Sequence, residues 1–150
     1  MIAHPPCTDL AVSGARWWKA KAEKDPLFQQ KALDFFMLFM NAPIDRIAVE
    51  NPVGAISRLY RKPDQYIQPY EFGEDASKNT GLWLKGLPLL TPTEVVEPSH
   101  QYIDPHGNKH KRWANQAPCG AEKTPPSDFR WRIRSRTFPG IAKAMAEQWG

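Results

Sequence analysis

The chain has 150 residues, of which 41% are hydrophobic, and this is enough for one domain with an apolar core. No apolar run approaches the length of a membrane span, and the first residues do not resemble a secretory signal. The two cysteines, Cys7 and Cys119, do not make a disulfide framework. We therefore expect a cytoplasmic protein. The net charge of +4 is uneven, because residues 109–136 hold eight Lys and Arg against two acidic residues. A basic block of this kind indicates a polyanionic partner, nucleic acid first, or else a solvated surface.

The chain begins with a short strand and a cysteine turn. Residues 1–3 are apolar and predict the end of a buried strand, and Pro5 and Pro6 then stop any helix or ladder. These prolines place Cys7 on a stiff turn at the carboxyl end of the strand, where open α/β sheets carry their chemistry. The alternative is that Cys7 is a small buried apolar residue, as most free cysteines are.

A helix and a second strand follow. Residues 13–18 predict a loop or a first helical turn, and Asp25 with Pro26 predicts the start of a helix over 26–41. That helix is apolar almost all round at its end, so we expect it to be buried against a sheet. Residues 46–49 predict a buried strand with Glu50-Asn51-Pro52 at its carboxyl end. The two strands should be parallel neighbours in a βαβ unit, with Cys7 and Glu50 within about 10 Å of each other.

The second half of the chain is richer in proline. A short helix is expected around 55–61, and strands are expected around 66–69 and 81–85. Residues 86–129 contain seven prolines and predict a loop region that includes the basic stretch 109–113 and Cys119. Residues 130–136 alternate and predict a strand with four arginines on one face. The last helix starts near Pro139 and should pack through Ile141, Met145 and Trp149.

Several familiar chemistries have no motif here. The sequence has neither of the common glycine-rich phosphate loops and no serine-hydrolase elbow. The spacing of His100, His106, His110 and Cys119 matches no standard zinc pattern. The remaining chemistry-bearing groups are a cysteine, a carboxylate and the arginine row.

These groups stand in motifs that resemble a known family. The stretch Pro6-Cys7-Thr8-Asp9-Leu10-Ala11-Val12-Ser13-Gly14 resembles the nucleophile loop of DNA (cytosine-5) methyltransferases. Glu50-Asn51-Pro52-Val53 is similar to their glutamate-asparagine-valine motif, with Pro52 inserted. The pair Arg132 and Arg134 is similar to the family's arginine pair, and residues 139–149 stand in the place of its closing helix. More specifically, the chain resembles the small phage-encoded methyltransferase-like proteins of this group.

The resemblance implies a fold, a chemistry and a partner. It implies one α/β methyltransferase-like domain over 1–150, with a partial Rossmann-type sheet and βαβ core in 1–85, a Pro-rich basic loop region in 86–129, and the arginine strand and closing helix in 130–150. It gives Cys7 the role of a nucleophile toward carbon 6 of cytosine and Glu50 that of an acid at N3, while Arg132 and Arg134 hold the base oxygen or a phosphate. The expected DNA-binding residues are Pro6, Thr8, Asn51, Lys109, Lys111, Arg112, Arg130 and Arg136.

The family also implies S-adenosylmethionine as the methyl donor. No segment of this sequence supplies the glycine-rich turn that binds this cofactor, so the methyl-donor half of the site is not expected here. Three alternatives follow: a shortened protein, a fragment that needs a partner chain, or a catalytically silent descendant. An unpaired sheet edge near Ile2 further predicts a homo-oligomer. The competing hypothesis for the whole chain is a non-catalytic module that binds DNA or another protein through residues 100–136.

For the arginine row the sequence leaves two alternatives. A row of four like charges favours a polyanion that lies along it. Alternatively, some of these arginines pair within the chain with Glu50, Glu122 or Asp128.

Overall fold

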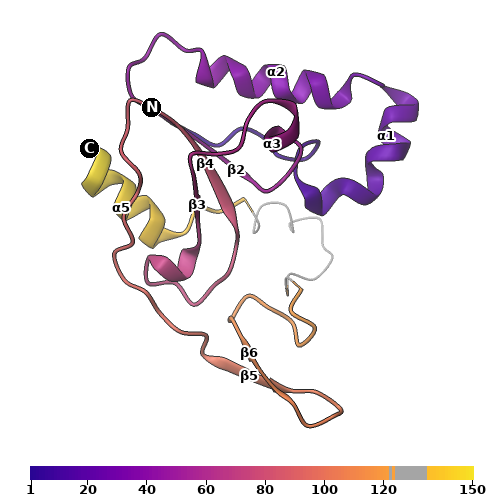
Figure 1. Cartoon of the computed structure of the whole chain (residues 1–150), viewed down its shortest axis with the longest axis vertical. Coiled ribbons are helices and arrows are strands. Elements are labelled where there is room, and N and C mark those ends of the chain that lie inside the picture. Colours follow the sequence, from indigo (N-terminus) through magenta and orange to yellow (C-terminus); the bar gives the residue numbers. More distant parts are fainter. Residues whose placement is uncertain (122, 124–134) are drawn as a thin grey trace. The chain divides into compact units, whose positions relative to one another are not determined.

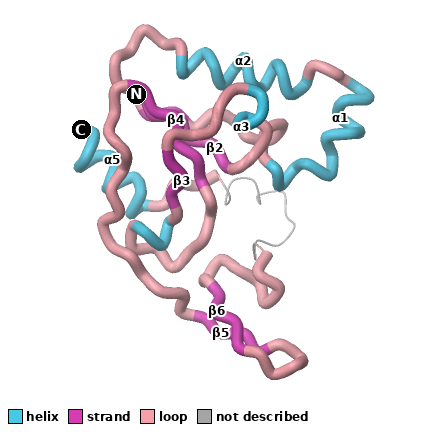
Figure 2. Tube along the Cα trace, in the orientation of Figure 1, coloured by secondary structure: helices cyan, strands magenta, loops and turns pink. Residues whose placement is uncertain are grey.

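A computed structural model describes residues 1–121, 123 and 135–150, which form a mixed α/β protein (Figures 1 and 2). The chain divides into two compact units. Unit 1 comprises residues 1–67 and 79–89, and unit 2 comprises residues 68–78 and 90–150.

Unit 1 is built on a small mixed sheet. Its strands are β1 (Ile2–Ala3), β2 (Ile47–Pro52), β3 (Gln65–Ile67) and β4 (Thr80–Lys85), in the order β1-β2-β4-β3. Strands β1 and β2 are parallel, as the sequence predicted, whereas β4 is antiparallel to both of its neighbours. Two parallel strands need a crossover connection, and helices fill it here.

Helix α2 (Phe28–Met40) covers the sheet with one stripe only. Leu33, Phe36 and Met40 recur at helical spacing, are buried, and belong to the same core as Ile47 and Trp83. The expectation that this helix packs against a sheet is confirmed by this stripe, while the opposite stripe faces solvent, with Leu38 67% exposed.

The other helical segments of unit 1 are short. The 3₁₀ helix η1 (Val12–Trp17) leads directly into α1 (Trp18–Lys24), where the sequence predicted only a loop or first turn. Helix α3 (Ile56–Leu59) lies within the predicted range 55–61 and buries Ile56. Asp25 does not cap α2 at its first turn. Its Oδ1 instead accepts a hydrogen bond from the Leu27 N–H (3.1 Å) in the turn before the helix.

Unit 2 contains a hairpin and the last helix. Strands β5 (His100–Ile103) and β6 (Lys109–Arg112) pair antiparallel and form a short hairpin that the sequence did not predict, while the other described residues of 86–129 form loops, as expected. A 3₁₀ turn, η2 (Pro69–Glu71), begins the unit. Helix α5 (Pro139–Trp149) buries the predicted residues Ile141, Met145 and Trp149, and also Ala144. No helix in the described part of the chain is long and apolar enough to cross a membrane.

Candidate functional site

The register of the parallel strands brings His4 to Glu50. Ala3 is paired with Val49, so the residues that follow them, His4 and Glu50, lie side by side. His4 Nδ1 and Glu50 Oε2 are 3.1 Å apart, and the Glu50 side chain is only 17% exposed. The sequence predicted that Glu50 approaches the cysteine turn but assigned no role to His4. The available signal was the position of His4 as the first residue after β1.

Asn51 fixes the segment before Cys7. Its side chain is fully buried, and its Nδ2 donates a hydrogen bond to the Pro5 carbonyl oxygen (3.3 Å). Its Oδ1 is buried and has no hydrogen-bond partner among the residues that the structure describes. Asn51 was predicted as a DNA-binding residue. In this arrangement its contact is with the chain itself, and it positions the turn that carries Cys7.

Cys7 lies on a closed turn. Its carbonyl oxygen accepts hydrogen bonds from the N–H groups of Leu10 (3.0 Å) and Ala11 (2.7 Å), both of which are buried. Cys7 itself is half-buried, while its neighbours Pro6 and Thr8 are exposed. The turn is therefore anchored from inside, and Pro6 and Thr8, which the resemblance assigns to DNA binding, are exposed on it.

The turn after Cys7 packs directly on the segment after β2. The Ala55 N–H donates to the Leu10 carbonyl oxygen (2.7 Å), and the Val12 N–H donates to the Val53 carbonyl oxygen (3.0 Å). A Cβ on Gly54 would lie 2.7 Å from the Leu10 carbonyl carbon, so this close approach requires glycine. The two predicted motifs thus form one structure, although β2 continues through Glu50, Asn51 and Pro52 where a loop was expected.

Asp9 joins the same turn to the helices. Its carboxylate forms an ion pair with Lys21 of α1, and its carbonyl oxygen accepts a hydrogen bond from Gln29 Nε2 of α2 (3.3 Å). The cysteine turn is therefore held from three sides: by β2, by α1 and by α2. Such anchoring keeps the turn in one conformation.

The predicted basic stretch lies on β6 in unit 2. Lys109 is exposed, Lys111 pairs with Glu97 (2.8 Å), and Arg112 Nε donates to the Pro118 carbonyl oxygen (2.9 Å). Both partners of the Lys111–Glu97 pair are more than two thirds exposed, so the pair adds little stability and leaves Lys111 available to another anion. This stretch belongs to unit 2, whereas the cysteine turn belongs to unit 1.

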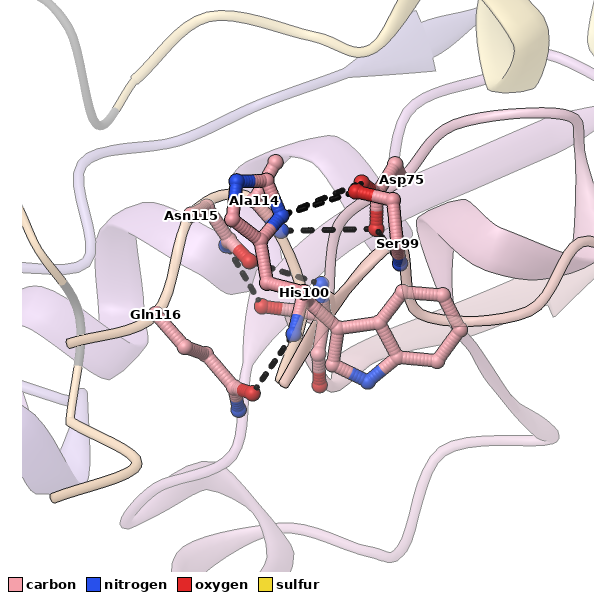
Figure 3. Close-up of polar contacts among 8 residues, drawn as sticks. Asp75, Ser99, His100, Ala114, Asn115 and Gln116 are labelled. Atoms are coloured by element: carbon pink, nitrogen blue, oxygen red, sulfur yellow. Dashed lines mark hydrogen bonds and ion pairs between the residues drawn. The ribbon is translucent and has the colours of Figure 1, made fainter. Parts of the chain in front are cut away.

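Asp75 fastens both ends of the hairpin (Figure 3). Its carboxylate accepts hydrogen bonds from the Ser99 hydroxyl and from the N–H groups of Ser99 (3.4 Å) and Ala114 (3.3 Å). Ser99 precedes β5 and Ala114 follows β6. The Ser99 hydroxyl is the main cause that lowers the pKa of Asp75 below its ordinary value, because hydrogen bonds favour the charged carboxylate.

The base of the hairpin has further supports. Asn115 accepts from the Ser77 N–H (3.1 Å) and donates to the Ser77 carbonyl oxygen (2.9 Å). Tyr70 and Trp113 stack with their ring centroids 4.6 Å apart. The sequence gave no sign of this cluster, because its members come from segments about 40 residues apart.

The predicted arginine row is mostly outside the described residues. The arginines of the row that lie outside the described part of the chain are Arg130, Arg132 and Arg134, so the predicted strand and its contacts stay predictions. Ser135 lies in a turn, and Arg136 is exposed and outside any helix or strand. Within the part that the structure describes, the partner of Glu50 is His4 rather than an arginine.

Residues 1–121, 123 and 135–150 contain no group of three or more His, Cys, Asp or Glu that could hold a metal ion. Two of the histidines have partners of another kind: His100 Nδ1 lies 2.8 Å from the Ser99 hydroxyl, and His110 Nε2 lies 3.0 Å from Asp104. Cys119 is exposed.

Comparison with known proteins adds no relative. No model of a protein family matches the chain, and neither curated proteins nor solved structures contain a match. The functional argument therefore rests on the geometry above and on the motifs in the sequence.

Proposed function

We propose that the chain is a DNA (cytosine-5) methyltransferase-like protein in which the cysteine turn and the end of β2 bind a pyrimidine base. The observation that carries this proposal is the convergence of the two motifs. His4 contacts Glu50, Asn51 contacts Pro5, and Gly54 packs on Leu10, so Cys7 and Glu50 belong to one structure. Either motif alone would be a weak indication.

The proposed chemistry is an addition to the base. The Cys7 thiolate forms a bond to carbon 6, and the electron pair displaced in the ring is neutralised by a proton that Glu50 delivers to N3. A carboxyl group that gives up a proton needs a nearby source to regain it. His4, 3.1 Å from Glu50, fits that role, because its Nδ1 lies within hydrogen-bond distance of the carboxyl oxygen and an imidazole nitrogen can pass on a proton.

We also propose a Rossmann-type fold, which the arrangement of the sheet favours. Strands β1 and β2 are parallel and joined by a helical crossover, and β3, which is antiparallel to β4, runs in the same direction as β2. The antiparallel strand β4 lies inside the sheet, between β2 and β3, so the part of the sheet that favours this fold is the parallel β1–β2 pair with its helical crossover. Cys7 then follows the carboxyl end of β1, and Glu50 lies in the second half of β2, toward the end of the sheet where such folds bind their ligands.

DNA is the partner that the charge distribution favours. Pro6 and Thr8 flank Cys7 on the exposed side of the turn, and would contact the nucleotide. The residues proposed to contact the DNA backbone or base are basic; they are Lys109, Lys111, Arg112, Arg130, Arg132, Arg134 and Arg136. A duplex target would have to be flipped out of its stack to reach Cys7.

S-adenosylmethionine, which the family resemblance implies, does not fit the described residues. A nucleotide-like cofactor needs a glycine turn at which the backbone can approach it. The turn after β1 contains two prolines. After β2 there is a glycine, Gly54, but the space beside its Cα is occupied by the Leu10 carbonyl group. The proposal for this chain therefore concerns the base-side chemistry, and no step in it passes through the cofactor.

A covalent trap tests the proposal without a methyl donor. In 2-pyrimidinone the 4-amino group of cytosine is absent, so carbon 6 is more electrophilic and a thiolate adds to it more readily. An oligonucleotide with this base should form an adduct with the parent protein and with Cys119→Ser, and none with Cys7→Ser. Mass spectrometry locates the bond. An adduct confined to Cys119, or no adduct at all, would contradict the nucleophile role.

The exposed basic hairpin favours a second candidate, a non-catalytic module that binds DNA or protein. Binding to DNA with no adduct at Cys7 would support it. We also propose a homo-oligomer, because β1 forms an edge of the described sheet and Ile2 on it is 45% exposed. Sedimentation that shows only a 17.1 kDa monomer at tens of micromolar would argue against assembly.

A further inference from the structure

The β5–β6 hairpin has one exposed face of distinctive composition, on which Lys111 also pairs with Glu97. Gln101 is paired with Lys111, and Ile103 is paired with Lys109, so these four side chains share one face of the two-stranded ribbon. All four are exposed, and Ile103 is 57% exposed. A long amide, a branched apolar group and two ammonium groups on one ribbon face are a combination that a folding role does not explain.

The opposite face holds the ribbon together. There Tyr102 stacks on His110 across the strands, with ring centroids 6.2 Å apart, and the His110 Nε2 bonds Asp104 at the turn (3.0 Å). The Asp104 carboxylate also accepts hydrogen bonds from the N–H groups of His106 and Asn108, both at 2.9 Å. With Asp75 closing the other end, the ribbon is ordered before any partner arrives, which reduces the entropy cost of binding.

We propose that the β5–β6 ribbon enters the major groove of duplex DNA and contacts it with Gln101, Ile103, Lys109 and Lys111. The inference rests on the proposed function for DNA as the partner, and it adds the form of the DNA and the element that reads it. The major groove of B-form DNA is about 12 Å wide and admits a two-stranded ribbon. The residue types fit its edges, since Gln bonds adenine, Lys bonds guanine or phosphate, and an apolar side chain contacts the thymine methyl group.

Two competing partners fit the ribbon less well. The major groove of an A-form RNA helix is too deep and narrow for side chains to read, so duplex RNA should not replace duplex DNA. A second β-strand that adds to the ribbon edge is disfavoured by Lys109 and Lys111, because charged side chains on an exposed strand oppose pairing between chains.

The test compares two double variants in a binding assay. Lys109→Ala with Lys111→Ala removes two charges from the ribbon face, and Lys24→Ala with Lys143→Ala removes two charges from exposed helical positions. Fluorescence anisotropy with a 20-base-pair duplex is measured over a salt series for both variants and the parent. The ribbon variant should bind more weakly, with a log–log salt slope less steep by about one unit for each phosphate-binding lysine removed, and the helix variant should match the parent.

A chemical footprint then identifies the groove. Methylation of guanine N7, which lies in the major groove, should interfere with binding by the parent, and Gln101→Ala should weaken preference among duplex sequences rather than the salt slope. Interference only from methylation of adenine N3, in the minor groove, would overturn the proposal. So would equal binding by the ribbon variant and the helix variant, or tighter binding to duplex RNA of the same sequence.

The outcome is separable from the proposed base chemistry. The adduct at Cys7 is measured on a single-stranded oligonucleotide, where no major groove exists. A parent protein that forms the adduct but binds no duplex refutes the ribbon alone, whereas a parent that binds duplex in the expected way but forms no adduct refutes the nucleophile role alone.

Discussion

The replacement Gly54→Ala is the sharpest perturbation of the contact between the two motifs. The new Cβ would lie 2.7 Å from the Leu10 carbonyl carbon and 2.9 Å from the Ala11 Cα, whereas ordinary contacts span 3.4–4 Å. The obstruction is backbone on both counts and cannot rotate away. The cysteine turn must therefore move outward by roughly 1 Å, and this strains the Ala55–Leu10 and Asn51–Pro5 hydrogen bonds.

Two effects of opposite sign set the magnitude. Gly54 is not among the described glycines with positive φ, so alanine there reduces the entropy of the unfolded chain and stabilises the fold by about 0.4–1 kcal/mol. Overpacking of a close contact costs about 1–3 kcal/mol, and a weakened buried hydrogen bond adds about 1 kcal/mol. The clash should win, with a net loss of about 2 kcal/mol in the free energy of unfolding.

Two readouts test this account. Urea denaturation should show the loss of stability, and the rate at which an alkylating reagent modifies Cys7 should change in the folded protein. Gly107→Ala is the control, since its Cβ meets nothing within 4 Å and only its φ of +83° carries a cost, about 1–2 kcal/mol. It should leave Cys7 alkylation unchanged. If Gly54→Ala preserves both stability and Cys7 reactivity, the two motifs do not form the single structure described above.

Three further predictions concern the core and the hairpin. Phe36→Ala should lower the free energy of unfolding, measured by urea denaturation, by about 3–5 kcal/mol, because Phe36 is 0% exposed and packs against Trp83. Phe35→Ala, at a site 46% exposed, should lower it by less than about 1 kcal/mol. Equal losses for the two variants would contradict the orientation of α2. Asp75→Asn should speed hydrogen exchange of the backbone amides in β5 and β6, because the new amide side chain has one acceptor oxygen for Ser99 and Ala114 together. Unchanged exchange would show that Asp75 does not fasten the hairpin. The pKa values of Asp75 and Asp104 are lowered, chiefly by the hydrogen bonds from Ser99 and His110. The stability that these carboxylates give is therefore complete above the unfolded pKa of about 4 and is lost as the pH falls toward the lower folded pKa. Hairpin protection factors, which correct the exchange rates for the intrinsic pH dependence of amide exchange, should fall from about pH 5 to about pH 2, and unchanged protection factors would refute this.

Local sequence patterns predicted the first half of the fold well. The apolar start, the Asp25-Pro26 signal and the run 46–49 indicated β1, α2 and β2, and the structure confirms that the two strands are parallel neighbours. The same patterns missed α1, although Trp18–Lys24 contains the good helix formers Ala, Lys and Glu. They also ended β2 too early, because its last residues pair with Thr80 and Gly81, and local sequence does not reveal a partner 30 residues away.

The hairpin shows a different kind of failure. Its strands carry His, Gln, Lys and Arg, which have little strand preference, so composition favoured a loop. A signal was available in residues 104–108, where Asp, Pro, Gly and Asn stand together and are typical of a turn between two strands. What holds the hairpin at its base is Asp75, which precedes it by more than 20 residues, and no local pattern links the two.

The approach of His4 to Glu50 depends on strand register, and this makes the candidate site sensitive to β1. Only two residues of β1 pair with β2, and Ala3 opposite Val49 determines that His4 comes next to Glu50. A slip of one residue would turn each side chain to the other face of the sheet and separate the pair. The Asn51–Pro5 and Ala55–Leu10 hydrogen bonds lie beyond the strand and oppose such a slip. The buried amide and the glycine contact thus hold His4 against Glu50 and keep the cysteine turn beside them, where the proposed chemistry requires it.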